Sequence, residues 1–120
     1  MQKTLVFGAS LKPHRYSHIA VKRLLDHGME TEAFGLREGK IASVQIKTNL
    51  EDFQNIDTIT LYINPQRQAE YYNAIISLRP KRVIFNPGTE NPFFHKLLEQ
   101  QGIVAEEACT LVLLATNQYL

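Results

Sequence analysis

The sequence predicts an α/β fold, a three-layer open parallel sheet of about five strands with helices on both faces. Two observations carry this prediction: short apolar runs alternate with amphipathic stretches, and glycine or proline ends most of them. Buried strands separated by amphipathic helices form parallel sheets with right-handed crossovers. The expected strands cover residues 3–7, 31–34, 57–63, 82–85 and 103–105.

Helices are expected between these strands. Val21, Leu24 and Leu25 recur at helical spacing before Gly28, a common helix-ending residue. Similar apolar faces predict further helices over residues 66–78, 92–101 and 109–118.

The segment from residue 36 to residue 48 has only a weak pattern. Gly39 suggests a turn, and Val44 and Ile46 could form a short additional strand. Asn49 is of a type that caps helices, which predicts one helical turn through Phe53.

Composition limits the function classes. The 120 residues suffice for one domain, and 13 basic against 12 acidic residues leave a net charge of +1, which disfavours nucleic acid and membranes as partners. The single cysteine, Cys109, cannot form an internal disulfide, so a cytoplasmic protein is expected. We find no signal peptide and no apolar run of membrane-spanning length.

Ligands of open α/β sheets bind beyond the carboxyl ends of the strands. The first strand leads into residues 8–17, where Gly8 permits a sharp turn and a close approach of a ligand. The start of the next helix favours a phosphate, and Ser10, Arg15 and Ser17 add hydrogen-bond donors. Only the first glycine of the GxGxxG fingerprint is present.

Basic residues follow the expected strands at this edge, with Arg15 the leading phosphate-binding candidate. They are Lys12, Arg15, Arg37, Lys40 and Arg67, whereas Arg79, Lys81 and Arg82 belong to the opposite edge.

The end of the second strand discriminates between cofactors. NAD-binding domains place an acid there to hold the ribose hydroxyls, whereas this chain has Gly35, Leu36 and Arg37. Arg37 suits a phosphorylated ribose, as in NADP or coenzyme A. Glu32 or Glu38 could serve NAD if the strand boundary is displaced.

Taken in order, these features resemble the coenzyme A-binding domain family, the small stand-alone kind related to the nucleotide-binding domain of the succinyl-CoA synthetase α-subunit. The resemblance spans nearly the whole chain. The residues that match the family are Gly8-Ala9-Ser10, Arg15-Tyr16-Ser17, residues 24–28, the strand that begins at Asp57, residues 87–91 and Cys109.

The resemblance implies a Rossmann-like fold in which Gly8, Ala9, Ser10 and Arg15 lie at the coenzyme phosphates. It also implies that the segments at residues 64–65 and 86–88 flank the pantetheine arm. Gly35-Leu36 departs from the family, which often has an Asn-Pro pair there. The candidate cofactor-binding residues are Gly8, Ala9, Ser10, Lys12, Arg15, Tyr16, Ser17, Gly35, Arg37, Asn64, Pro65, Asn86, Pro87 and Gly88.

Catalytic and metal sites are not assigned. Cys109 could be an activated thiol if it opens the last helix, but a buried, inert cysteine is favoured. His14 and His18 have metal-ligand spacing without a third ligand nearby. The segment 111–114 suits the core or a dimer contact, so the chain is expected to be a monomer or a homodimer.

The function expected from the sequence is binding of coenzyme A, or an acyl-CoA, by a non-catalytic or regulatory protein. The alternatives are an NADP-dependent oxidoreductase fragment, a ligase-like subunit that acts with a separate chain, and a module used only for protein contacts.

Overall fold

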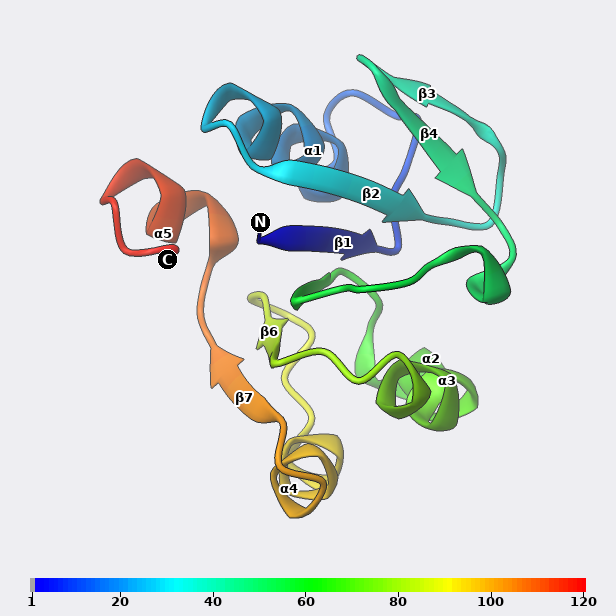
Figure 1. Ribbon diagram of the computed structural model, residues 1–120, viewed down its shortest axis with the longest axis vertical. Coiled ribbons are helices and arrows are strands. Elements are labelled where there is room, and N and C mark those ends of the chain that lie inside the picture. The colour runs from blue at the N-terminus through cyan, green and yellow to red at the C-terminus, as the bar shows by residue number, and fades with distance from the viewer. Residues whose placement is uncertain (1) are drawn as a thin grey trace.

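A computed structural model describes residues 2–120 of the chain. They form a mostly parallel sheet flanked by helices on both faces (Figure 1). The elements are β1 (Lys3–Phe7), α1 (Tyr16–Asp26), β2 (Glu30–Phe34), β3 (Gly39–Ile41), β4 (Val44–Lys47), the 3-10 turn η1 (Leu50–Asp52), β5 (Thr58–Leu61), α2 (Pro65–Gln68), the 3-10 turn η2 (Ala69–Tyr71), α3 (Tyr72–Ser77), β6 (Arg82–Phe85), α4 (Pro92–Gln100), β7 (Val104–Glu107) and α5 (Thr110–Ala115).

The sheet within residues 2–120 has seven strands in the order β3-β4-β2-β1-β5-β6-β7. All neighbouring strands are parallel except β3, which pairs antiparallel with β4. This confirms the predicted α/β class and open parallel sheet. The carboxyl ends of β1, β2 and β5 are in register at the centre, where Phe7 is paired with both Phe34 and Leu61.

Alternation along the strands builds a core on each face of the sheet. Phe7, Leu61 and Phe85 belong to the cluster that α3 and α4 cover, whereas Val6 and Ile84 belong to the cluster beneath α1 and α5. These side chains are all nearly or completely buried. The two-sided pattern explains why consecutive residues of the central strands are buried, including the polar Thr58 and Thr60 of β5.

The hairpin β3–β4 accounts for the additional strands. Gly39 begins β3 rather than marking a turn, and the turn lies at Ala42 and Ser43, where Ala42 has φ +53°. β3 is only three residues long and buries one side chain fully, Ile41, so its sequence has little periodicity. The expected cap at Asn49 is confirmed, because its side chain accepts a hydrogen bond from the N–H of Glu51.

Two helices differ from the expected ranges. The predicted helix over residues 66–78 is interrupted at Ala69–Tyr71, where Tyr71 lies edge-on to the rings of Phe7 and Phe34. The last helix ends at Ala115 instead of continuing to residue 118. Asn117 adopts φ +58°, and the N–H of Gln118 donates to the carbonyl of Leu113, which is the hydrogen bond of a Schellman motif.

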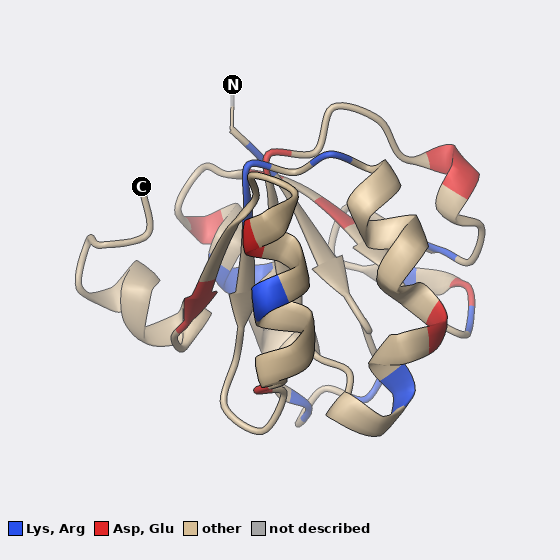
Figure 2. Cartoon of the chain, turned by 90° about the horizontal axis from the view of Figure 1, so that it is seen from below, with Lys and Arg blue, Asp and Glu red and all other residues tan. Residues whose placement is uncertain are grey.

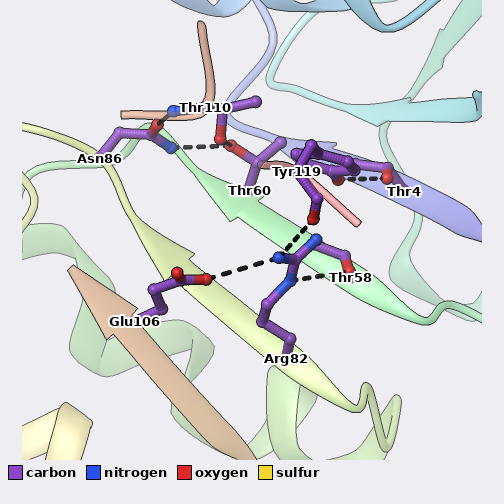
Figure 3. Close-up of polar contacts among 8 residues, drawn as sticks. All are labelled: Thr4, Thr58, Thr60, Arg82, Asn86, Glu106, Thr110 and Tyr119. Atoms are coloured by element: carbon purple, nitrogen blue, oxygen red, sulfur yellow. Dashed lines mark hydrogen bonds and ion pairs between the residues drawn. The ribbon is translucent and has the colours of Figure 1, made fainter. Parts of the chain in front are cut away.

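This early helix end returns the C-terminal segment to the sheet. Tyr119 is only 3% exposed, and its hydroxyl is hydrogen-bonded to that of Thr4 on β1. Arg82 lies over the Tyr119 ring, 4.6 Å from its centroid, and donates to the Tyr119 carbonyl at 2.8 Å (Figure 3). Within the apolar segment 111–114, Leu114 is buried while Val112 is 56% exposed, so core packing explains it only in part.

Candidate functional site

The carboxyl ends of β1, β2 and β5 surround a cavity of about 450 Å³, a volume typical of sites for small molecules. Its walls come from the loops after these three strands. The lining residues are Gly8, Ala9, Ser10, Leu11, Lys12, Arg15, Phe34, Gly35, Leu36, Arg37, Tyr62, Ile63, Arg67 and Tyr71.

Two glycines allow the three strand ends to meet backbone to backbone. Gly8 has φ +101°, and a Cβ there would lie 3.2 Å from the backbone of Tyr62. A Cβ on Gly35 would lie only 2.5 Å from the carbonyl oxygen of Ala9. The residue at the second strand end must therefore be small here, which gives a physical reason for the departure from the Asn-Pro pair.

The loop after β1 uses some of its backbone donors internally. The N–H groups of Gly8 and Ala9 both donate to the carbonyl of Phe34, at 2.9 and 2.8 Å. The N–H groups of Ser10 and Leu11 make no hydrogen bond within residues 2–120. Among the first four residues of the loop, the N–H groups of Ser10 and Leu11 are therefore the backbone donors left free, whereas those of Gly8 and Ala9 are occupied.

Basic residues lie in loops at both ends of the strands (Figure 2), so cations are not confined to one edge. At the edge opposite the cavity three of them are paired with acids, whereas Arg79 forms no ion pair within residues 2–120. Lys3 pairs with Glu32 at 3.1 Å, Lys81 with Asp57 at 3.6 Å, and Arg82 with Glu106 at 3.4 Å.

The cations around the cavity are not neutralised in this way. They are Lys12, Arg15, Arg37 and Arg67. All four are exposed, and none forms an ion pair with an acidic side chain within residues 2–120. They come from the loops after β1 and β2 and from α2, and they converge on one hollow, an arrangement that suits a ligand with several phosphates.

The floor of the cavity is aromatic and apolar. Tyr71 packs edge-on against Phe34, with ring centroids 5.7 Å apart, and Tyr62 and Ile63 continue the surface beyond β5. These residues were not among the sequence candidates, because they resemble ordinary strand and helix packing residues. Tyr62, an aromatic residue at the end of the third expected strand, was the available signal.

A second, more open hollow of about 550 Å³ adjoins the first. The two share four residues, namely Phe34, Gly35, Leu36 and Tyr71. The second hollow also contains the apolar Leu50 and the polar Asn49 and Glu51. A ligand bound in the cavity can therefore extend over the end of β2 toward η1.

Seven sequence candidates line the cavity: Gly8, Ala9, Ser10, Lys12, Arg15, Gly35 and Arg37. Two others lie at the start of α1 but outside the lining, Tyr16 being 72% exposed and Ser17 buried. The remaining candidates, Asn64, Pro65, Asn86, Pro87 and Gly88, lie after β5 and β6, also outside the lining.

The two asparagines in this group have different structural roles. Asn64 is exposed and caps α2, accepting a hydrogen bond from the N–H of Arg67 at 3.0 Å. Asn86 is 2% exposed, and its amide donates to Thr60 Oγ1 and to the Leu61 carbonyl, while its oxygen accepts from the Thr110 N–H (Figure 3). The side chain of Asn86 thus joins β6 to β5 and to the start of α5.

A second buried network holds the loops after β5 and β6 together. The Gln68 amide donates to the carbonyls of Ile63 and Thr89, at 2.9 and 2.8 Å. Asn91 donates to the Gln68 oxygen and to the Tyr72 hydroxyl, both at 2.9 Å. Because Ile63 lines the cavity, this network makes that wall rigid before any ligand arrives.

Cys109 is the residue before α5, and it is partly buried. The nearby Tyr62 hydroxyl lies among Thr60, Thr110 and Cys109. Burial raises the pKa of Tyr62 from its ordinary 10.0 to about 12.

Alkaline pH is therefore expected to destabilise the fold through Tyr62. Between about pH 10 and pH 12 the unfolded chain releases the phenol proton while the folded chain retains it, so the free energy of unfolding falls as pH rises. Urea unfolding at about pH 8 and about pH 11 measures this loss. Tyr62→Phe should show a smaller loss, although burial also raises the pKa of Tyr119. An equal loss in both proteins would contradict the assignment to Tyr62.

The two histidines with metal-ligand spacing lie in different surroundings. His14 is exposed, whereas His18 is buried and its Nδ1 lies 2.9 Å from the Ser10 carbonyl. Residues 2–120 contain no group of three or more His, Cys, Asp or Glu side chains that could hold a metal ion. None of the helices in this range has the length and apolar character needed to cross a membrane.

Comparison with known proteins gives one family. Residues 2–115 match a family model described as a CoA binding domain. The crystal structure of an uncharacterized protein is similar over 98% of both chains, with 44% identity and a TM-score of 0.94. No curated protein matches the sequence.

More distant structures share the fold. A protein from Thermus thermophilus has 20% identity and a TM-score of 0.87, over 98% of this chain and 90% of that chain. A hypothetical protein from Pyrococcus horikoshii OT3 has 26% identity and a TM-score of 0.81, over 92% of this chain and 80% of that chain.

Proposed function

Because the chain belongs to the coenzyme A-binding domain family, we propose that it binds coenzyme A, or an acyl-CoA, in the cavity beyond β1, β2 and β5. We propose further that it acts as a non-catalytic or regulatory protein. The observation that carries the proposal is the convergence of Lys12, Arg15, Arg37 and Arg67, without acidic partners in residues 2–120, on a hollow with an apolar floor.

The donor set fits the charges of coenzyme A, which carries a diphosphate and a ribose 3′-phosphate. Ser10, Lys12 and Arg15 follow β1 and would hold the diphosphate, since arginine forks and backbone N–H groups bind phosphate oxygens well. Arg37 follows β2 and would hold the 3′-phosphate. The apolar surface of Leu36 and Tyr71 would cover the base.

The pantetheine arm would leave the cavity along the loops after β5 and β6. Asn64, Pro65, Pro87 and Gly88 lie there, near the surface. The Asn86 side chain is buried and already makes three hydrogen bonds, so its contribution would be to hold these loops rather than to touch the arm.

Calorimetric titration tests the choice of cofactor. Coenzyme A is expected to bind about tenfold more tightly than its 3′-dephospho form, because the smaller ligand leaves Arg37 without a phosphate. A preference for NADPH would instead support an oxidoreductase fragment, for which Arg37 is equally suitable. Absence of binding to all three ligands would favour a module used for protein contacts.

Arg15→Ala is expected to weaken coenzyme A binding about tenfold, because the variant loses the hydrogen-bonded phosphate contact that an exposed arginine provides. The effect should shrink as salt is raised, because salt screens the attraction. Arg23→Ala is the matched control, since Arg23 is an exposed arginine near the other end of α1 and does not line the cavity. Equal affinities of the two variants would refute the phosphate assignment.

A further inference from the structure

His18 is a buried residue whose ring contacts the loop after β1. It belongs to the first turn of α1, is 6% exposed and does not line the cavity. Its Nδ1 lies 2.9 Å from the carbonyl oxygen of Ser10. Because a carbonyl oxygen can only accept a hydrogen bond, Nδ1 carries the proton and donates it.

This bond sets the direction of the next backbone donor. Residues 2–120 contain no cis peptide bond, so the peptide between Ser10 and Leu11 is trans. In a trans peptide the N–H points opposite to the C=O, so the Leu11 N–H points away from His18. It makes no hydrogen bond within residues 2–120, although Leu11 lines the cavity.

The loop is also held at two other points. Its first N–H groups, those of Gly8 and Ala9, donate to the Phe34 carbonyl. The Leu11 side chain rests against Gly39 so closely that a Cβ on Gly39 would lie 2.7 Å from it. Within residues 2–120 the bond from His18 is the hydrogen bond made to the Ser10–Leu11 peptide group itself, whereas the Lys12 N–H donates to the Ser10 side chain, so His18 is the group that determines the rotation of this peptide.

We propose that the Leu11 N–H binds an anionic phosphate oxygen of the ligand, and that His18 is the positioning residue that holds this N–H ready. This proposal rests on the proposed function, which supplies the identity of the ligand. It assigns a role to a histidine that touches no ligand itself, and it identifies one backbone donor among those of the loop.

Substitutions at His18 test whether it positions the Leu11 N–H. Asparagine and glutamine serve as a matched pair, because they place an amide nitrogen at different distances along the side chain. The amide nitrogen of asparagine is the same number of bonds from Cα as Nδ1, whereas that of glutamine corresponds to Nε2. His18→Asn should therefore keep the bond to Ser10, and His18→Gln and His18→Leu should lose it. We expect coenzyme A affinity within about twofold of the original protein for His18→Asn and about tenfold weaker for the other two variants.

The backbone amide resonance of Leu11 distinguishes the two possible roles of His18. A purely structural role of His18 would leave the ligand-induced shift of this resonance unchanged, whereas a positioning role would not. In the original protein and in His18→Asn, titration with coenzyme A or with inorganic pyrophosphate should shift this resonance downfield. In His18→Leu the shift should be much smaller at saturation, with circular dichroism confirming that the variant is folded. If His18→Leu does not fold, the comparison of His18→Asn with His18→Gln decides.

The outcomes separate this inference from the proposed function. A Leu11 shift with pyrophosphate, but no binding of coenzyme A, would overturn the cofactor and leave the role of His18 intact. Coenzyme A binding without a Leu11 shift, or with equal affinity in all His18 variants, would overturn the inference and leave the proposed function intact. If neither ligand moves the Leu11 resonance, the inference is wrong.

Discussion

Replacing Gly35 with alanine is expected to lower the free energy of unfolding by about 3 kcal/mol, the upper part of the range for overpacking a tight site. The new Cβ would lie 2.5 Å from the Ala9 carbonyl oxygen and 3.1 Å from Cγ2 of Ile46. Ala9 cannot withdraw easily, because its own N–H and that of Gly8 are bonded to the Phe34 carbonyl. The loop after β1 must therefore move as a unit, and coenzyme A affinity should fall with it.

Gly39→Ala is the matched control for Gly35→Ala. Its Cβ would also meet a neighbour closely, at 2.7 Å, but that neighbour is the flexible, partly exposed side chain of Leu11. Rotation of Leu11 should limit the loss to less than about 1 kcal/mol. Urea unfolding of both variants measures the difference. Equal losses would show that contact with the Ala9 backbone is not what requires glycine at position 35.

Asn86→Ala is expected to cost about 3 kcal/mol of stability. The substitution leaves the Thr110 N–H, the Thr60 hydroxyl and the Leu61 carbonyl without the partner that Asn86 provides at 2.9, 2.7 and 3.0 Å. Thr60 and Thr110 are completely buried, so water cannot readily replace the lost bonds. Each unsatisfied buried polar group costs about 1–3 kcal/mol, although Thr60 and Thr110 retain their bond to each other.

Asn64→Ala provides the comparison, since both asparagines follow a strand at the same edge of the sheet. Asn64 is exposed and caps a short helix, so its loss should cost only about 1 kcal/mol. Thermal unfolding of the two variants, with coenzyme A titration of the folded protein, distinguishes their roles. If Asn86→Ala kept full stability and lost cofactor affinity, Asn86 would be a ligand contact rather than a link between strands.

Local sequence signals predicted the central part of this fold well. The strand over residues 3–7 is found with the expected limits, and Gly8 follows it with a positive φ. The cap at Asn49 was predicted from one side chain, because capping depends on the residue and its own helical turn. The candidate site residues that follow β1 and β2 were also predicted from local sequence, because glycine and basic residues come directly after buried strands in the chain.

Other features were not visible locally. The β3–β4 hairpin lies at the edge of the sheet, where Ile41 is the fully buried residue of β3, so the period of two is barely expressed. Tyr62 and Tyr71 have local sequence surroundings typical of packing residues, and only the spatial meeting of β5 and η2 with β1 places them at the cavity. The side chain of Asn86 was expected at the cofactor, but its three hydrogen bonds join segments 24 to 26 residues away in the chain.

The sequence by itself determined the α/β class, the order of the central strands and helices, and the glycine turn after the first strand that borders the cavity. These follow from hydrophobic periodicity and from the conformational limits of individual residues, which act over a few positions. The tertiary structure decided which cations are paired, because folding brings acids beside Lys3, Lys81 and Arg82, whereas Arg15 forms no ion pair within residues 2–120. It also decided why position 35 is glycine: the atom that excludes a side chain there belongs to Ala9, which pairing of β1 with β2 brings into contact.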